Sequence, residues 1–392
     1  MDGARHWIWI AKNIWEFWNS QGFLDRQRLC LERGQQQIQG VLQGFCLYLR
    51  HRIKPLNHYT IIQDIYMNKF EYCVAIRTVG KAGEKFRQEL ESLHNQTVKP
   101  KHIFIHLAEG FERPDFTVGY EEYITTPKGL VHQRACSADG VDTKFLLILD
   151  DDVYFPSDSV EKLYEALMEH DADGIAPDTF PTQNSSVWSK IKDFCAHGVF
   201  PRSNDGWAIK IHRNGTFSYN NNPDKGGIYR TQSAAGTALF CRTSAFKGIH
   251  YEDELWIDRY PAGTFGEDQI MFYKFHINGY KLLMAYDSGI LHLDANTNSA
   301  SQKTYEKLYY RAMSLYLIWY RSCCDLEGNS KTERLLCTLA YAGRIIMGSL
   351  TRIVFSIMNG SPRFITAYIK GNLEARKFVR SEEYRGLKGL RV

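Results

Sequence analysis

The sequence predicts an α/β protein with a mostly parallel central sheet, flanking helices and helical segments at both ends. Apolar residues make up 44% of the 392 residues and charged residues 23%, without a low-complexity tract, which is a globular composition. From residue 72 onward, short apolar runs alternate with helical patterns, as in sheets that are covered on both faces. From residue 301 to the end the pattern is helical. We therefore expect three regions, at 1–69, 70–300 and 301–392.

An amphipathic helix is predicted near the start of the N-terminal extension, residues 1–69. Its apolar side chains recur at helical spacing at Trp7, Ile10, Ala11, Ile14, Trp15 and Trp18. Tryptophan is favoured where one edge of the side chain is wet and the other is apolar, so contact with a membrane interface is one interpretation. Packing against the rest of the chain is the other, and the sequence leaves both open.

The first half of the sheet is predicted from three apolar runs that alternate with two helical segments. The strands are expected at Tyr72–Ile76, His102–Leu107 and Phe145–Leu149. One helix is marked by Phe86, Leu90 and Leu93, and the other spans about 131–138. This alternation predicts a Rossmann-like half.

The second half is less regular. Asp158 and Glu161 match a capping box at the start of a helix. The stretch 179–227 is rich in Asn, Gly, Ser and Pro and predicts long loops, which often border a functional site. Three further elements are expected: a strand at 237–241, a helix from about 268 to 278 and a strand at 281–286.

The C-terminal region, 301–392, is predicted to be helical. Its most apolar window, Leu335–Met358, contains Arg344 and Arg352. A charge near the centre of a bilayer costs about 2.5 kcal/mol or more, so we do not expect a transmembrane helix. A helix that lies on a membrane, or that packs on the core, fits this window better.

Charge is divided unevenly along the chain. Residues 341–392 carry ten Lys and Arg against three Asp and Glu, or +7, and residues 1–60 carry eight against four, or +4. Because the whole chain has a net charge of +4, the middle is near −7. Basic ends indicate either contact with an anionic membrane surface or ordinary solvated helix faces. We expect no nucleic-acid partner.

The cysteines and the N-terminus bear on the compartment. Nine cysteines are scattered without a C-x-x-C pair, so neither a disulfide framework nor a zinc site is predicted. The N-terminus lacks the order of charged, apolar and small residues that marks a secretory signal. We therefore expect a cytoplasmic protein. Because its ends are basic, it could also associate peripherally with the inner face of the cytoplasmic membrane.

Three consecutive carboxylates follow the third predicted strand. Asp150, Asp151 and Asp152 are expected at the carboxyl edge of the sheet, where open α/β folds bind ligands. Carboxylates this close repel one another unless they share a cation, and oxygen ligands together with a bound diphosphate suit Mg²⁺ or Mn²⁺. The alternative is a solvated acidic turn that caps the following helix.

Two further motifs carry candidate chemistry. Glu267 and Asp268 stand at the start of a predicted helix, where free N–H groups stabilise carboxylates, so capping is one interpretation. The other is a general base that accepts the proton of an attacking hydroxyl. His292 lies between apolar residues and, taken alone, is more typical of a structural histidine than of a ligand.

In order and spacing, five motifs together resemble the family 2 glycosyltransferases. They lie between about Phe70 and Asp294, at Ala75–Gly80, Thr126–Arg134, Leu149–Asp152, Gly236–Thr243 and Gly266–Gln269. The resemblance implies a GT-A fold, a nucleotide-diphosphate sugar donor, a Mn²⁺ or Mg²⁺ cofactor and a single displacement with inversion at the sugar carbon.

The resemblance also implies a role for each matching residue. Asp268 matches the catalytic base, with Glu267 beside it in a supporting role, and Asp152 and His292 match the metal ligands. Gly236 and Thr237 match the loop beneath the donor sugar and the acceptor. The positions expected to contact the nucleotide-sugar are Ile76, Arg77, Thr78, Glu109, Gly129, Arg134, Asp150 and Asp151.

Three positions depart from the family pattern. Ile76 stands where proline is usual, Cys136 stands where asparagine usually follows the arginine, and the segment 106–109 lacks the usual acidic pair that contacts the base. The donor is therefore left open between UDP- and dTDP-sugars. For the acceptor, the resemblance implies a glycan or a lipid-linked precursor of a bacterial surface polysaccharide.

Two other functions stay open at this point. A nucleotidyltransferase can share the sheet and the acidic metal site, and Arg77, Gly80, Lys81 and Gly83 supply part of the basic, glycine-rich loop it would need. The other is a non-catalytic sugar-binding or scaffold protein that kept the fold, although Asp152, Asp268 and His292 are all present.

Overall fold

The computed structural model describes residues 70–179, 206–220, 222–261, 266–293 and 305–392, all of which belong to one compact unit, Phe70–Val392. The predicted N-terminal helical extension, 1–69, lies outside the described residues, and so does the expected boundary at 300/301. The limits of the three predicted regions therefore stay predictions.

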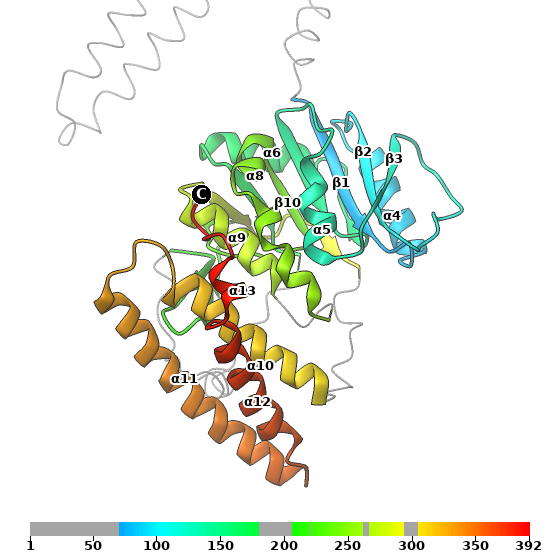
Figure 1. Cartoon of the computed structure of the whole chain (residues 1–392). Helices are drawn as coiled ribbons and strands as arrows, with labels where there is room; N and C mark the ends of the chain where they lie inside the picture. The colour runs from blue at the N-terminus through cyan, green and yellow to red at the C-terminus, as the bar shows by residue number, and fades with distance from the viewer. Residues whose placement is uncertain (1–69, 180–205, 221, 262–265, 294–304) are drawn as a thin grey trace, which may run out of the picture. The chain divides into compact units, whose positions relative to one another are not determined.

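The first half of the central sheet is parallel, as predicted (Figure 1). β1 (Tyr72–Thr78) lies between β2 (Ile103–Ala108) and β4 (Phe145–Leu149) and is parallel to both. β3 (Glu121–Thr126), which the sequence did not predict, extends the sheet in parallel beyond β2. Its sequence lacks an apolar run because it is an edge strand with half-exposed side chains.

The second half of the sheet is mixed. β10 (Ala238–Arg242) is antiparallel to both β4 and β6 (Gly174–Pro177), and β11 (Leu282–Ala285) is parallel to β6. β9 (Ile228–Arg230) closes the order β3-β2-β1-β4-β10-β6-β11-β9 as an antiparallel edge. The predicted fold class, an α/β fold with a mostly parallel central sheet and flanking helices, is confirmed.

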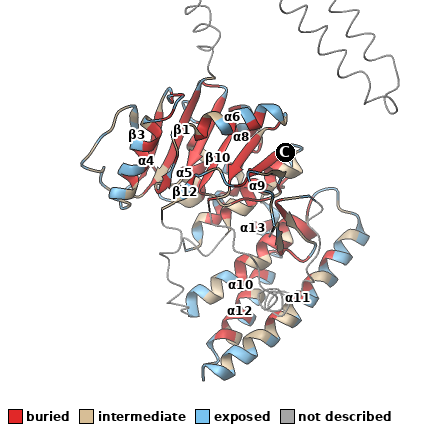
Figure 2. Ribbon diagram, turned by 180° about the vertical axis from the view of Figure 1, so that it is seen from behind, coloured by how far each residue is buried: buried red, intermediate tan, exposed pale blue. Residues whose placement is uncertain are grey.

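Helices cover both faces of the sheet (Figure 2). Alternate side chains of each strand point toward opposite faces and pack against these helices. Val74 and Ile76 point toward one face, and Cys73 and Ala75 point toward the other. The first face is covered by α4 (Glu84–His94) and α6 (Ser159–Glu169). The second face is covered by α5 (Leu130–Ala135), α8 (Thr243–Gly248) and α9 (Glu267–Ile277).

Two local predictions need correction. α6 begins where expected, but Asp158 makes no capping bond; its carboxylate pairs with Lys162 at 2.7 Å, and Glu161 accepts from Thr97 Oγ1 at 2.7 Å. The backbone at Asp158, with φ −111° and ψ 8°, departs from the extended geometry that lets an N-cap side chain reach the first turn. The predicted loops at 179–227 contain, within the described residues, the hairpin of β7 (Ile209–Ile211) and β8 (Phe217–Tyr219).

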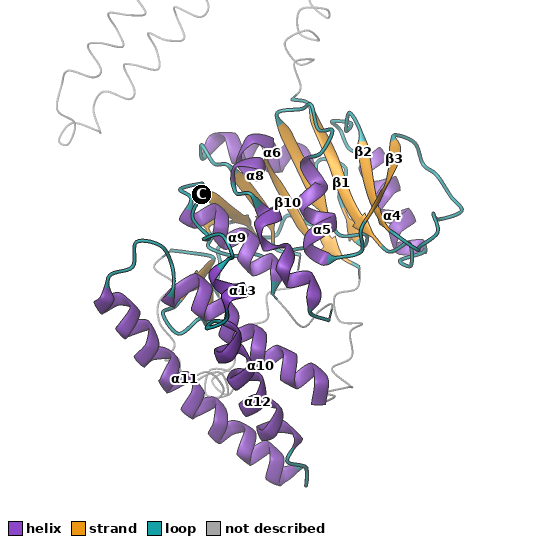
Figure 3. Cartoon of the chain, viewed as in Figure 1, coloured by secondary structure: helices purple, strands orange, loops and turns teal. Residues whose placement is uncertain are grey.

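The C-terminal region is helical, as predicted, and packs on this core (Figure 3). Its elements are α10 (Tyr305–Trp319), a π-helical turn (Tyr320–Cys324), α11 (Lys331–Met358), α12 (Arg363–Phe378) and α13 (Glu382–Arg385). The Trp319 ring stacks on Tyr341 with centroids 3.9 Å apart, and its Nε1 donates to the Arg213 carbonyl oxygen. Within the described residues, no helix combines the length and hydropathy needed to cross a bilayer.

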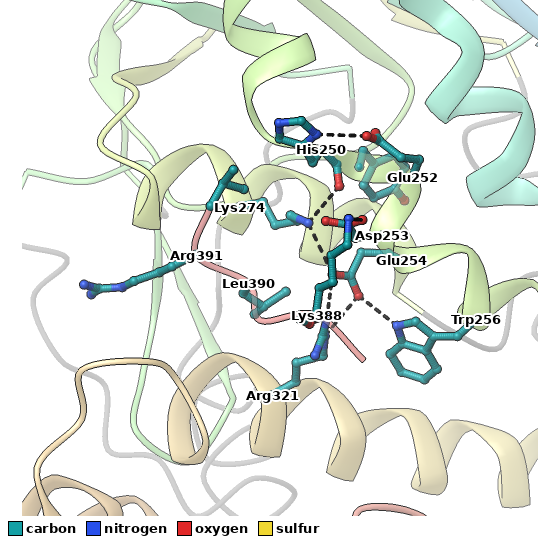
Figure 4. Close-up of polar contacts among 12 residues, drawn as sticks. His250, Glu252, Asp253, Glu254, Trp256, Lys274, Arg321, Lys388, Leu390 and Arg391 are labelled. Carbon is teal, nitrogen blue, oxygen red and sulfur yellow. Dashed lines mark hydrogen bonds and ion pairs between the residues drawn. The ribbon is translucent and has the colours of Figure 1, made fainter. Parts of the chain in front are cut away.

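A buried ion cluster joins the C-terminal region to α9 (Figure 4). Glu254, in the 3₁₀ helix η2 (Tyr251–Arg259), accepts two hydrogen bonds from Arg321, at 2.7 and 3.0 Å. Lys274 of α9 lies 3.4 Å from the same carboxylate, and Trp256 Nε1 donates to it at 2.9 Å. Because a buried charge is stable only when paired, this cluster fixes how the C-terminal region meets α9.

Candidate active site

The predicted chemistry gathers at one edge of the sheet. β1 and β4 end at Thr78 and Leu149, so Asp150 follows at their shared carboxyl edge. β10 runs antiparallel to β4, with Ala238 opposite Leu149, and the residues before it therefore lie at the same edge. The Asp150 N–H donates to the Thr237 carbonyl oxygen at 3.0 Å, which joins the two segments directly. This is the edge at which open α/β sheets bind ligands.

Asp150 is held by two arginines from different elements. Arg77 Nε lies 2.6 Å and Arg134 Nη2 lies 3.0 Å from its Oδ1. Burial alone would raise the pKa of Asp150, but the charges and hydrogen bonds of the two arginines hold it below the usual value. Asp150 is therefore a fixed anion at the centre of the site.

Asp151 points toward the end of β1. The Thr78 hydroxyl donates to its Oδ2, and the Gly80 N–H donates to Thr78 Oγ1 at 2.8 Å. Burial raises the pKa of Asp151 to about 6, and the neighbouring charges of Asp152 and Asp150 contribute in the same direction. A carboxyl group with this pKa would gain from a nearby cation, which favours its ionised form.

Asp152 and His292 are brought together by a short two-stranded ribbon. β5 (Val153–Tyr154) pairs antiparallel with β12 (Leu291–His292), with His292 opposite Val153. The Leu293 N–H donates to the Asp152 carbonyl oxygen at 2.8 Å and extends the pairing. As a result His292 Nε2 lies 3.1 Å from Asp152 Oδ1. The sequence placed these two residues in one site, and the ribbon is how the chain joins them.

The spacing of the pair fits a shared divalent cation. Two atoms bound to one octahedral ion at about 2.1 Å and at right angles lie about 3.0 Å apart, close to the separation in this pair. Among the described residues no group of three or more His, Cys, Asp or Glu side chains is arranged to hold a metal. A cation held by this pair would therefore complete its shell with water or with phosphate oxygens, as Mg²⁺ usually does.

Asp268 is joined to the acidic triplet through Gly236 and Arg134. The Gly236 N–H donates to Asp268 Oδ2 at 3.2 Å, and Arg134 Nη2 donates to the Gly236 carbonyl oxygen at 2.7 Å. Since Arg134 also binds Asp150, two residues connect the two acidic motifs. A Cβ on Gly236 would come within 2.8 Å of Asp268 Cβ and 2.9 Å of both Arg134 Nη atoms, so only glycine fits here.

Glu267 and Asp268 differ in their surroundings. Asp268 is half-buried, and its Oδ1 accepts from the Gln269 N–H at 2.8 Å in the first turn of α9. Glu267 is buried, with Arg77 Nη1 3.6 Å from its carboxylate. Burial and the adjacent Asp268 raise the pKa of Glu267, while Arg134 and Arg77 oppose this. Asp268 is thus the more accessible of the two carboxylates.

The four other predicted positions differ in their surroundings. Ile76 is fully buried in the sheet core, so its side chain contacts no ligand there. Thr237 is buried, with its hydroxyl 2.8 Å from that of Thr179. Glu109 is exposed directly after β2, and its N–H donates to the Thr126 carbonyl oxygen. Gly129 precedes α5, where a Cβ would lie 2.2 Å from Asp258 Oδ2.

Three residues near the site were missed from the sequence. Asp258 caps α5 by accepting from the Val131 and His132 N–H groups, and it comes from η2, more than 120 residues away. Tyr251 donates to the Glu267 carbonyl oxygen at 2.9 Å. Nothing in a single sequence marks either residue.

The third missed residue is Glu89, a charged residue whose position on the apolar side of a predicted helix could have marked it in the sequence. It lies on the buried side of α4, three residues after Phe86 and four before Leu93, and it accepts from the Val153 N–H at 3.2 Å. Burial raises the pKa of Glu89 well above its usual value, and Asp151 and Asp152 act in the same direction. This buried carboxyl group supports the turn that carries the aspartates.

Comparisons with known proteins give a limited result. No protein-family model matches the sequence, and no curated protein does. A solved structure with a similar backbone is that of GalNAc-T7 with UDP, GalNAc and Mn²⁺, at 14% sequence identity and a TM-score of 0.43. The alignment covers 76% of this chain and 59% of that one. A likeness at this level assigns neither family nor substrate, and membership in family 2 stays a prediction.

Proposed function

We propose that the chain is a metal-dependent glycosyltransferase that moves a sugar from a nucleotide-diphosphate donor to a hydroxyl acceptor, with inversion. One observation carries the proposal: the pair Asp152 and His292 lies at the same edge of the sheet as Asp268. Hydrogen bonds through Asp150, Arg134 and Gly236 connect the two acidic motifs. A cation-binding pair and an accessible carboxylate at one edge of the sheet are what this chemistry requires.

Asp268 is proposed as the general base. Its two oxygens each accept one backbone hydrogen bond, from Gly236 and from Gln269, which fixes the plane of the carboxylate and leaves lone pairs for an incoming hydroxyl. As the acceptor oxygen bonds to the anomeric carbon, its proton passes to Asp268. The bond from that carbon to the diphosphate oxygen breaks, and the electron pair leaves with the diphosphate. Attack opposite the leaving group inverts the configuration.

Asp152 and His292 are proposed to hold Mn²⁺ or Mg²⁺. When bound, the ion would neutralise the charge that develops on the departing diphosphate. Arg134 is fully buried beside the site, and its Nε and Nη1 find no acceptor among the described residues. Arg134 and Arg77 would hold Asp150 in place while the nucleotide-sugar binds, and Glu267 would be held by Arg77 in support of Asp268.

The donor and the acceptor are proposed by class. The donor is a UDP- or dTDP-sugar, with Thr78, Glu109, Gly129 and Asp151 as further candidate contacts. The acceptor is a glycan or a lipid-linked precursor of a surface polysaccharide. Such an acceptor would place the protein at the cytoplasmic face of a membrane.

The donor class is testable by thermal shift with a panel of nucleotide-sugars, each with and without Mn²⁺. We expect one nucleoside diphosphate series to raise the melting temperature only when Mn²⁺ is present. A response to nucleoside triphosphates with release of pyrophosphate would instead indicate a nucleotidyltransferase. No response to any nucleotide-sugar would favour the scaffold alternative.

The base is testable by Asp268→Asn. We expect donor binding within about twofold of wild type and transfer reduced by about 10²–10⁴-fold, the usual contribution of a general base. The matched control is Asp171→Asn, because the Asp171 side chain is 99% exposed and asparagine tolerates its φ of 43°. Turnover by Asp268→Asn within threefold of this control would exclude Asp268 as the base.

A further inference from the structure

α11 turns its apolar side outward. Its buried residues are Cys337, Tyr341, Arg344 and Gly348. Arg344 points inward and donates from Nη1 to the Asn214 carbonyl oxygen at 2.9 Å. A helix at the surface of a soluble domain normally buries its apolar side and exposes its charged residues. In α11 the arrangement is reversed.

The outward side forms a continuous stripe of large aliphatic side chains, which we call the α11 stripe. Its members recur every three, four or seven residues and are between 42% and 75% exposed, and they are Leu335, Leu339, Ile346, Leu350, Ile353 and Ile357. At 1.5 Å per residue the stripe is about 33 Å long. Figure 2 shows this run of exposed residues along α11.

The stripe itself carries no charge. Between Leu335 and Ile357 the charged residues are Arg344, which is buried, and Arg352, whose guanidinium lies 4.3 Å from the centre of the Tyr368 ring on α12. Within the part of the chain that the structure describes, nothing covers the stripe, since its side chains are exposed there. An uninterrupted apolar surface of this length marks a contact with another apolar phase or molecule.

The C-terminal helical region that carries the stripe also exposes several cations. Arg363 is exposed just after the end of α11, and α12 exposes Lys370 and Arg376 beside the apolar Ile369 and Leu373. A groove of about 650 Å³ along α12 has four basic residues among its lining and one acidic residue. A helical region that exposes both an apolar stripe and basic side chains has the composition of a segment that binds the interface of an anionic membrane.

The charge of the chain indicates which kind of partner covers the α11 stripe. Residues 341–392 carry +7 and residues 1–60 carry +4. A second copy placed on the stripe through a twofold axis would bring two +7 regions together, and the N-terminal segment would add further positive charge. An anionic lipid surface offers acyl chains to the apolar stripe and phosphates to the basic side chains of the same region.

We propose that the α11 stripe docks on an anionic lipid bilayer, with the helix axis in the plane of the membrane. The stripe would enter the boundary between headgroups and acyl chains, and the basic side chains would contact the phosphates. The absence, among the described residues, of a helix able to cross a bilayer fits this in-plane position. The proposal rests on the surface of α11 and goes beyond sugar transfer.

The test uses the full chain and sedimentation with vesicles of phosphatidylcholine alone or with 30% phosphatidylglycerol. We expect binding to the anionic vesicles, and at least tenfold weaker binding by the double variant Ile346→Glu/Leu350→Glu. Met168→Glu is the matched control, because Met168 is 41% exposed on α6, away from the stripe, and it should bind like wild type. Lys370→Gln should weaken binding about fivefold, and only to anionic vesicles.

Other occupants give different results. If a second copy covers the stripe, the wild-type chain sediments as a dimer, the double variant is a monomer and neither binds vesicles. If residues 1–69 cover it, the wild-type chain is a monomer that does not bind vesicles, and the double variant melts at a lower temperature. Either pattern overturns the proposal. Vesicle binding does not depend on turnover, so a chain that binds vesicles but transfers no sugar would contradict only the proposed function.

Discussion

Removing the charge of Glu254 is the perturbation whose cost can be worked out most fully from the structure. Glu254 is fully buried and faces two buried cations, Arg321 and Lys274. Arg321 binds it with two hydrogen bonds, at 2.7 and 3.0 Å, and Lys274 Nζ lies 3.4 Å away. In Glu254→Gln both cations lose their shared anion, and breaking a buried pair in this way costs about 3–5 kcal/mol.

Lys274→Met removes one of the two cations of the cluster and should lower the free energy of unfolding much less than Glu254→Gln does. Its loss leaves the two-bonded pair of Glu254 and Arg321 intact, and burial already lowers the pKa of Lys274 from its usual value. The main loss is the hydrogen bond from Nζ to the His250 carbonyl oxygen at 2.9 Å, worth about 0.5–1.5 kcal/mol.

The assay for both variants is urea unfolding followed by far-ultraviolet circular dichroism at pH 7.5. The free energy of unfolding is taken from the midpoint at an unchanged slope. We expect Glu254→Gln to lose at least twice as much stability as Lys274→Met. If Lys274→Met is the more damaging variant, the account of Glu254 as the shared anion is wrong.

Two further predictions concern acid stability and the glycine at the site. His106 is fully buried, and burial lowers its pKa to about 4. Between about pH 6.5 and 4, the unfolded chain therefore binds a proton at this residue that the folded chain does not. The free energy of unfolding falls as the pH falls through this range. Between pH 7 and 5 wild type should therefore lose about 2 kcal/mol more than His106→Leu in urea unfolding, and equal losses would refute this. Gly236→Ala places a Cβ within 2.9 Å of Asp268 and Arg134, and should reduce transfer about 100-fold because it displaces these two side chains. Gly343→Ala, where a Cβ meets nothing within 4 Å, is the control, and equal activity of the two variants would contradict the close fit.

The sequence predicted those parts of the fold that depend on local pattern. β1 and β4 were found because their apolar runs are intrinsic to the segments, and α9 was found because an apolar and aromatic run ends at Gly279. β3 and β9 were missed because edge strands bury few side chains and therefore show no apolar run. The same limit applies to the capping box, since Glu161 is drawn away by Thr97, a partner 64 residues distant.

The candidate site was predictable as a set of residues but not as a geometry. Consecutive aspartates after a buried strand and a later histidine do lie together, with Asp152 and His292 3.1 Å apart. What the sequence could not supply is how they are held. The contacts of Arg134 with Asp150 and of Asp258 with α5 depend on which segments the chain brings close.

The central claim is that Asp152 and His292 hold a divalent cation together with the diphosphate of the donor. Calorimetric titration of UDP and of dTDP tests it most directly, with wild type, Asp152→Asn and His292→Ala, each in Mn²⁺ and in EDTA. The account predicts that one of the two nucleotides binds wild type at least tenfold more tightly in Mn²⁺, and that each substitution removes this gain. Equal affinity in Mn²⁺ and EDTA for wild type, or an undiminished gain in both variants, would contradict it.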